Sequence, residues 1–308
     1  MKSKFIYTFS YTEEEKDLCQ LEMRSFFQNH SSNSVLESTI GVHPNRSPFM
    51  KERIEVLLEG GNLQEVLSQL AVFSIIGTFK VKFVVVNESK ISTANQKEIE
   101  REVGLSLNGN ADLTNPDQFY GILVWKDRWY FGKYVKSESI WFQHQKKPRN
   151  YSTALNTRVA RAVVNIAVPD GKNVTVIDPC CGIGTVLVEA LSMSINIVGS
   201  DINPLAVIGA RENVTHFGYS TEVTIKDLRE VTGQYDIAIV DMPYNLCSVI
   251  SDSEKQEMMQ SVRQFAKKVV VITLEPMDSL CKQGGLEIKD RCVVKKGKMF
   301  SREILVME

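Results

Sequence analysis

The stretch that decides the fold of this 308-residue chain is Val174-Thr-Val-Ile-Asp178-Pro179-Cys180-Cys181-Gly182-Ile183-Gly184-Thr185. A run of β-branched residues ends in an acid, which predicts a buried strand at 174–178. Two glycines then form a turn, and the apolar spacing after them predicts a helix at 185–193. A strand, turn and helix of this kind opens a nucleotide-binding α/β unit, because glycines admit a ligand close to the backbone and the helix N-terminus offers unpaired N–H groups.

The glycine turn excludes two common nucleotide sites. It lacks the third glycine of the dinucleotide fingerprint, and it lacks the Lys-Ser/Thr pair of a phosphate loop. Asp178 directly before the turn would repel phosphates and favours a ligand that carries an ammonium or hydroxyl groups. A dehydrogenase is therefore disfavoured.

The second half of the chain alternates between strand and helix patterns. We predict strands at 174–178, 195–200, 222–226, 236–241 and 269–274, and helices at 158–168, 185–193, 204–216 and 254–268. This order predicts an α/β fold with a parallel sheet and helices on both faces. Two further strands, Leu286 to Val294 and Arg302 to Val306, are separated by a short turn and should close the sheet as an antiparallel pair.

The first half of the chain has a mixed α+β pattern. We predict strands at 4–11, 34–40, 79–86, 118–125 and 128–135, and helices at 13–28, 63–76 and 94–105. Residues 49–59 are ambiguous between helix and strand. A polar, basic stretch after residue 142 indicates a linker into the second half.

Composition narrows the class of protein. A net charge of −1 argues against a histone-like binder, although local basic patches can still bind nucleic acid. No stretch approaches the roughly 20 apolar residues of a membrane span, and the first residues show no signal-peptide pattern. The six cysteines form no CxxC pair and have no histidine at metal spacing. We therefore expect reduced thiols, a cytoplasmic protein, no membrane segment and no metal.

Four acidic residues end or directly follow predicted strands: Asp178, Asp201, Asp227 and Asp241. The carboxyl ends of parallel strands meet at one edge of a sheet, where open α/β folds bind their ligands. Asp201 lies about 20 residues after the glycine turn, a spacing that suits an acceptor for ribose hydroxyls. Asp227 is placed to accept a hydrogen bond from an adenine amine. A single such acid can be a turn or cap residue, but four in order indicate one site.

These residues resemble the class I S-adenosylmethionine-dependent methyltransferases, whose Rossmann-like fold also ends in antiparallel strands. The resemblance implies that Asp178, Gly182 and Gly184 line the methionine end of the cofactor, Asp201 its ribose and Asp227 its adenine. The complete set of cofactor-binding residues that it implies is Asp178, Pro179, Cys180, Gly182, Gly184, Thr185, Asp201, Ile202, Asn203, Asp227 and Leu228.

The fourth acid opens a motif, Asp241-Met242-Pro243-Tyr244. It is similar to the (Asp/Asn)-Pro-Pro-(Tyr/Phe) motif of enzymes that methylate exocyclic amines of nucleobases. The resemblance implies that Asp241 and the Met242 carbonyl accept the amine protons, Pro243 holds the loop and Tyr244 stacks on the extruded base. Met242 stands where proline is usual, but the carbonyl acceptor survives this change.

Over its whole length the chain resembles the THUMP-domain guanosine-N2 tRNA methyltransferases of the guanosine-10 type. The stretches that carry this resemblance are Lys147-Pro-Arg-Asn-Tyr-Ser-Thr-Ala-Leu-Asn-Thr-Arg-Val-Ala-Arg-Ala162, Phe79-Lys-Val-Lys-Phe83, Glu98-Ile-Glu-Arg-Glu-Val-Gly-Leu105 and Asp112-Leu-Thr-Asn-Pro-Asp117. It implies a ferredoxin-like domain at 1–60, a THUMP RNA-binding domain at 61–142, a linker at 143–157 and a Rossmann-like methyltransferase domain at 158–308.

A basic, aromatic strip supports an RNA partner. We expect Lys133, Lys146, Lys147 and Arg149 to contact tRNA phosphates, which would give salt-dependent recognition of a folded RNA. The alternative is a solvated strand face over an aromatic core. We expect the protein to act as a monomer.

Two other functions stay open. The same motif serves adenine-N6 methyltransferases that act on DNA or RNA. Met242 also leaves open a THUMP RNA-binding protein whose catalytic site has decayed.

Overall fold

The computed structural model describes residues 3–28, 34–86, 91–151, 154–171, 173–243, 250–296 and 300–308. The chain divides into two compact units. The first unit comprises Met1–Ser10 and Ser31–Glu138, and the second comprises Tyr11–His30 and Ser139–Glu308. The chain therefore enters the second unit early, returns to the first, and then completes the second.

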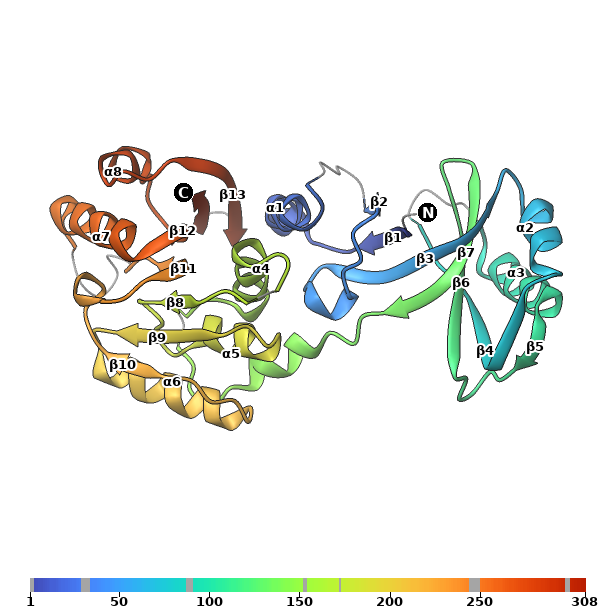
Figure 1. Ribbon diagram of the computed structural model, residues 1–308, viewed down its shortest axis with the longest axis horizontal. Helices are drawn as coiled ribbons and strands as arrows, with labels where there is room; N and C mark the ends of the chain where they lie inside the picture. The colour runs from blue at the N-terminus through green and yellow to red at the C-terminus, as the bar shows by residue number, and fades with distance from the viewer. Residues whose placement is uncertain are drawn as a thin grey trace. The chain divides into compact units, whose positions relative to one another are not determined.

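The second unit is built on a sheet whose described strands lie in the order β10-β9-β8-β11-β12-β14-β13 (Figure 1). The first five strands of this order pair in parallel, and β14 pairs antiparallel with both β12 and β13. The predicted parallel sheet with a terminal antiparallel pair is thus confirmed. The strands are β8 (Val176–Asp178), β9 (Ile197–Asp201), β10 (Val223–Ile225), β11 (Tyr235–Asp241), β12 (Ala266–Thr273), β13 (Ile288–Lys296) and β14 (Phe300–Met307).

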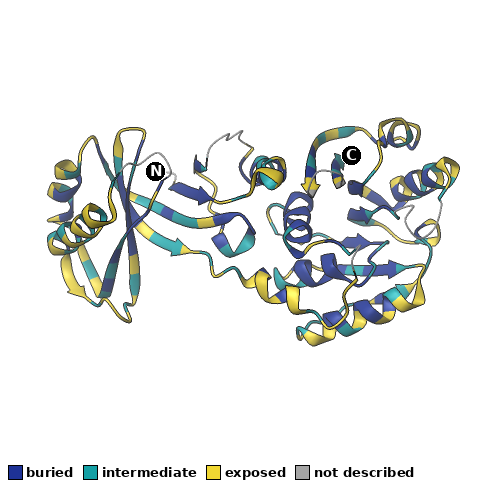
Figure 2. Ribbon diagram, turned by 180° about the vertical axis from the view of Figure 1, so that it is seen from behind, coloured by how far each residue is buried: buried dark blue, intermediate teal, exposed yellow. Residues whose placement is uncertain are grey.

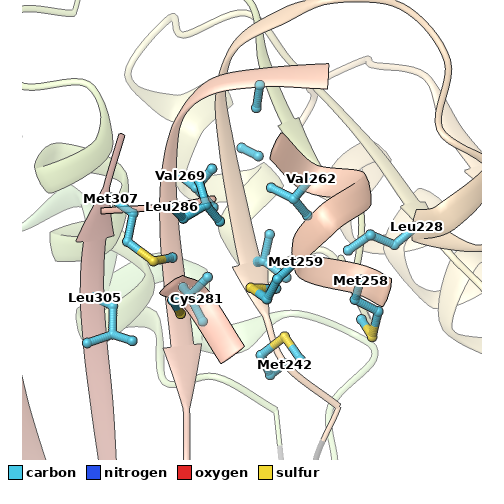
Figure 3. Close-up of a cluster of buried hydrophobic side chains, with 14 of the residues drawn as sticks. Leu228, Met242, Met258, Met259, Val262, Val269, Cys281, Leu286, Leu305 and Met307 are labelled. Carbon is cyan, nitrogen blue, oxygen red and sulfur yellow. The ribbon is translucent and has the colours of Figure 1, made fainter. Parts of the chain in front are cut away.

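Helices cover both faces of this sheet. One face carries a cluster in which Met259 and Val262 of α7 pack with Val269 and Val271 of β12 and with Leu305 of β14 (Figure 3). Helix α4 contacts β11, β12 and β14 on the opposite face. Inner strands of the sheet are buried, whereas the outer surfaces of the helices are exposed (Figure 2). The helices are α1 (Lys16–Phe27), α4 (Thr157–Ala167), α5 (Thr185–Ser192), α6 (Pro204–His216), α7 (Asp252–Phe265) and α8 (Asp278–Gln283), with 3₁₀ turns η1 (Glu13–Glu15), η3 (Ile140–Lys146) and η4 (Leu228–Glu230).

Helix α1 belongs to the second unit although the strands before and after it belong to the first. It packs on α4 and β13. Asn165 of α4 donates its amide N–H to Glu22 at 2.6 Å in a buried position. The guanidinium of Arg24 donates two hydrogen bonds of 2.9 Å to the carboxylate of Asp290 on β13. Planar pairs of this kind fix both position and orientation, so α1 is a structural part of the second unit.

The first unit contains a second sheet, whose described strands lie in the order β2-β1-β3-β7-β6-β4-β5. Strand β4 pairs in parallel with β5 and β6, and the other pairs are antiparallel. Helices α2 and α3 supply Val66, Leu70 and Val103 to a core over this sheet. The elements are β1 (Lys4–Phe9), β2 (Val35–Ser38), η2 (Pro44–Arg46), β3 (Met50–Gly60), α2 (Leu63–Leu70), β4 (Ser74–Phe83), α3 (Thr93–Ser106), β5 (Asn108–Ala111), β6 (Gln118–Trp125) and β7 (Arg128–Lys136).

The first unit differs from its sequence prediction in three elements. The ambiguous residues 49–59 form most of strand β3. The predicted helix at 63–76 ends at Leu70, because β4 begins at Ser74 and pairs with β5 and β6. Strand β5 was not predicted, since its sequence Asn-Gly-Asn-Ala has no strand propensity. The assignment of this half to ferredoxin-like and THUMP domains stays a prediction.

Candidate active site

Three strands of the second unit end in acids at the same edge of the sheet. Asp178 ends β8, Asp201 ends β9 and Asp241 ends β11. These strands run in parallel, so their carboxyl ends lie together at one cavity of about 850 Å³. That volume lies within the range of small-molecule sites, roughly 300–1,000 Å³. The predicted residues that line it are Asp178, Pro179, Cys180, Gly182, Thr185, Asp201, Ile202, Asn203, Asp227, Leu228, Asp241, Met242 and Pro243.

The glycine turn is hydrogen-bonded to the neighbouring strand β9. The backbone N–H of Gly182 donates to the Asp201 carboxylate at 2.8 Å, and the N–H of Cys181 donates to the Ser200 carbonyl at 2.9 Å. Both glycines have positive φ, +51° at Gly182 and +76° at Gly184, so both occupy backbone conformations that L side chains rarely adopt. Local sequence thus sets the shape of the turn, and Asp201 holds it against β9.

Gly184 is not among the residues that line the cavity. It is the N-cap of α5, and a Cβ at this position would lie 3.1 Å from the Cβ and 3.2 Å from the Cα of Ala210 on α6. Its absent side chain therefore allows the turn to pack against α6. The predicted contact between Gly184 and a cofactor stays a prediction.

Asp178 is the most buried acid of the site, with 1% of its surface exposed. Burial raises the pKa of its carboxyl well above the usual range, and the nearby carboxylates of Asp241 and Asp201 raise it further. The N–H of Cys180 donates to Asp178 at 3.3 Å and acts in the opposite direction. A cavity with this charge distribution favours a positively charged ligand, because a cation would stabilise the ionised carboxylates.

Asp227 is already paired in the structure. Arg229 donates to its carboxylate from Nη2 at 2.7 Å and from Nε at 3.0 Å, and this pairing lowers the pKa of Asp227. Arg229 also forms an ion pair of 3.1 Å with Glu257 on α7. Asp227 is therefore ionised and held in place at the rim of the cavity.

Met242 is a core residue. Its side chain is 3% exposed and lies in the cluster beneath α7, near Met258 and Met259 (Figure 3). Its backbone N–H donates to the Ile272 carbonyl of β12 at 2.9 Å. These contacts hold the residue from two sides at the point where the chain leaves β11. Tyr244, the last residue of the predicted motif, lies outside the described residues.

Residues 144–273 match the family model described as an RMKL-like methyltransferase domain. The matched residues include the glycine turn and strands β8 to β12. They bring the glycine turn and the Asp241-Met242-Pro243 segment together in one cavity, as the sequence predicts for a methyltransferase.

Two similar proteins are named as tRNA methyltransferases. A tRNA (guanine(10)-N2)-dimethyltransferase of Methanothermobacter thermautotrophicus is 25% identical over 275 residues, which cover 80% of each chain. A protein of the same name from Methanocaldococcus jannaschii is 24% identical over 189 residues, which cover 55% of this chain and 53% of that protein.

The crystal structure of TrmN from Thermus thermophilus has the same overall fold. It superposes with a TM-score of 0.52 at 17% identity and covers 99% of both chains. The predicted Rossmann-like methyltransferase fold is thereby confirmed.

The predicted RNA-binding residues lie outside the cavity of the methyltransferase domain. Lys133 is exposed on β7 of the first unit, and Lys146 is exposed at the end of η3. Lys147 is half-buried, and burial lowers its pKa. The Arg149 guanidinium pairs with Glu212 of α6. Their contacts with RNA stay predictions.

Sequence reasoning missed several residues that line the cavity. Tyr151 comes from the predicted linker, Arg229 from η4, and Glu254 and Met258 from α7. Tyr151 lies within a stretch that carries the family resemblance, so a signal for it was present. Spacing does not place Glu254 and Met258, because packing of α7 against the sheet brings them to the cavity. Arg229 follows Asp227 in η4 and reaches the cavity beside the acid with which it pairs.

No helix among the described residues is both long and apolar enough to cross a membrane. Within the described ranges, no group of three or more His, Cys, Asp or Glu side chains is arranged to hold a metal ion.

Proposed function

We propose that this chain is an S-adenosylmethionine-dependent methyltransferase that modifies the exocyclic N2 amine of a guanosine in tRNA. The names of the two relatives support the substrate. The observation that carries the proposal is the single cavity shared by the glycine turn and the Asp241 segment. Direct methyl transfer requires donor and amine to meet in one site, and this geometry supports it.

The residues around the glycine turn fit the cofactor. Its ammonium and sulfonium groups are cationic, and Asp178 and Asp201 supply negative charge at this end of the cavity. A side chain at Gly182 would obstruct the space, since its Cβ would lie 2.8 Å from the Tyr151 hydroxyl. When bound, S-adenosylmethionine supplies a methyl group that its sulfonium has already made electrophilic. Asp178 would hold the methionine end, Asp201 the ribose and Asp227 the adenine.

Asp241 and Met242 would orient the acceptor amine. The lone pair of this amine is delocalised into the guanine ring, so the nitrogen is a poor nucleophile until its protons are held. The Asp241 carboxylate and the Met242 carbonyl can each accept one of these protons, which directs the lone pair towards the donor. The hydrogen bond to Ile272 and the buried Met242 side chain fix the backbone that presents this carbonyl. Pro243 would hold the loop, and Tyr244 would stack on the base.

Residues 1–142 and the basic residues that follow them would bind the tRNA. We assign residues 1–60 to a ferredoxin-like domain and residues 61–142 to a THUMP domain, joined by residues 143–157 to the catalytic domain. Lys133, Lys146, Lys147 and Arg149 would contact phosphates. We further propose a cytoplasmic monomer that needs no metal.

The proposal is tested by incubating the full-length protein with tRNA transcripts and methyl-tritiated cofactor, followed by nucleoside analysis. We expect label in N2-methylated guanosine, and none from a transcript in which guanosine-10 is replaced by adenosine. Asp241→Asn should lower the turnover rate about 100-fold, because one acceptor of the amine is lost. Asp236→Asn is the matched control: it makes the same change near the start of β11 and should preserve activity.

Other outcomes identify the alternatives. Label in N6-methyladenosine would replace the guanosine assignment with the adenine-N6 one. Binding of cofactor and tRNA without any transfer would indicate a decayed site. Loss of activity in Asp236→Asn as severe as that in Asp241→Asn would remove the specific role of Asp241.

A further inference from the structure

Tyr151 lies in the cofactor cavity without a role in the proposed function. It precedes α4 in the chain, and 48% of the residue's surface is exposed. Its hydroxyl lies 2.8 Å from the position that a Cβ on Gly182 would occupy, so it stands directly beside the glycine turn. Among the described residues, none is hydrogen-bonded to this hydroxyl.

The segment that carries Tyr151 is anchored to the turn. Asn213 of α6, which is fully buried, accepts a hydrogen bond from the Arg149 N–H at 2.9 Å. Its amide donates to the Arg149 carbonyl at 3.0 Å and to the Ile183 carbonyl of the turn at 2.8 Å. The N–H of Ala154 donates to the Tyr151 carbonyl at 3.1 Å. One buried side chain therefore ties the Tyr151 segment to the residue between the two glycines.

The Tyr151 hydroxyl is protonated at neutral pH, and its surroundings strengthen this preference. Burial raises the pKa of Tyr151 to about 12, and the carboxylates of Asp201 and Asp241 contribute to the rise. The hydroxyl is a neutral hydrogen-bond donor in a cavity that is also lined by Asp178, Asp201 and Asp241.

Several backbone donors of the turn are already engaged within the protein. The N–H of Gly182 donates to Asp201, and the N–H of Gly184 donates to the Cys181 carbonyl at 2.8 Å. The N–H of Cys180 donates to Asp178. The methionine end of the cofactor carries a carboxylate as well as an ammonium. That carboxylate needs a donor, because acidic side chains surround the turn.

We infer that Tyr151 is a further cofactor-binding residue, whose hydroxyl donates a hydrogen bond to the carboxylate of the cofactor's methionine moiety. This inference rests on the proposed function. Asp178 and Tyr151 thus bind the two charged groups of the methionine moiety: the Asp178 carboxylate contacts the ammonium, and the Tyr151 hydroxyl contacts the carboxylate. The pair orients the amino-acid end and so fixes the direction in which the sulfonium methyl points.

The test compares two ligands that differ only at this carboxylate. Calorimetric titration of the full-length protein with S-adenosylmethionine and with decarboxylated S-adenosylmethionine gives the dissociation constants. Tyr151→Phe should weaken binding of the intact cofactor about tenfold, the usual effect of losing one hydrogen bond to a charged group. Binding of the decarboxylated compound should change less than about twofold, since it has no partner for the hydroxyl.

Tyr235→Phe is the matched control. Tyr235 begins β11, at the end opposite Asp241, where it packs against Phe265 and does not line the cavity. It should leave both dissociation constants unchanged. If the unmodified protein binds no S-adenosylmethionine, the proposed function itself fails. If it binds normally but Tyr151→Phe weakens both ligands equally, or neither, the role of Tyr151 is overturned and the proposed function stands.

Discussion

Replacing Met242 by proline would restore the usual motif residue, and the structure predicts that this change is destabilising. Proline has no N–H, so the hydrogen bond to the Ile272 carbonyl would be lost. Ile272 is fully buried, and leaving such a carbonyl unpaired costs about 1–3 kcal/mol. The proline ring also fills less space than the methionine side chain in the cluster of Figure 3.

Two further variants separate these contributions. Met242→Ala keeps the N–H but removes the buried side chain, and it should lower the free energy of unfolding by about 2–4 kcal/mol. Met242→Pro should cost about 1–3 kcal/mol more than Met242→Ala, because it also loses the hydrogen bond. Met242→Leu preserves volume and N–H and should cost less than about 1.5 kcal/mol.

Urea-induced unfolding followed by circular dichroism gives these differences. The reasoning is refuted if Met242→Pro is as stable as Met242→Leu. It is also refuted if the proline variant gains transfer activity, because Met242 would then be a departure from the motif without a structural function.

Three other predictions follow from the site. Gly184→Ala should lower the free energy of unfolding by roughly 2–4 kcal/mol, because alanine disfavours the left-handed backbone and its Cβ would contact Ala210. Gly285 has the same φ of +76° but no atom within 4 Å of an added Cβ, so Gly285→Ala should show only the loss that comes from the backbone conformation. Asn213→Leu should lower unfolding free energy by about 2–4 kcal/mol and raise the cofactor Kd, and an unchanged Kd would disconnect Tyr151 from its anchor. The raised pKa of Asp178 makes the folded state hold a proton that the unfolded chain releases, so stability should fall as pH rises above about 3.8. Asp178→Asn should abolish the decrease in stability that Asp178 causes, and this variant should be more stable than the unmodified protein at neutral pH. It should also bind the cofactor more weakly. Equal profiles of stability against pH for the two proteins would contradict this prediction.

The site could be predicted as far as local rules extend. The β-branched run before Asp178 and the two glycines determine a strand and a turn over about ten residues, where the backbone itself limits the choices. Asp201 and Asp241 could be placed at the same edge because parallel strands align their carboxyl ends. The sheet that holds these acids could be predicted from the alternation of strands and helices along the chain. This prediction does not depend on which distant residues are in contact.

Tertiary packing decided the rest. Helix α1 joins the second unit through Arg24 and Glu22, whose partners lie more than a hundred residues away. The direction of the Met242 side chain and the approach of Tyr151 to the turn likewise depend on which surfaces meet. A residue's neighbours along the chain restrict its own dihedral angles, but burial and charge pairing are set by segments that only folding brings together.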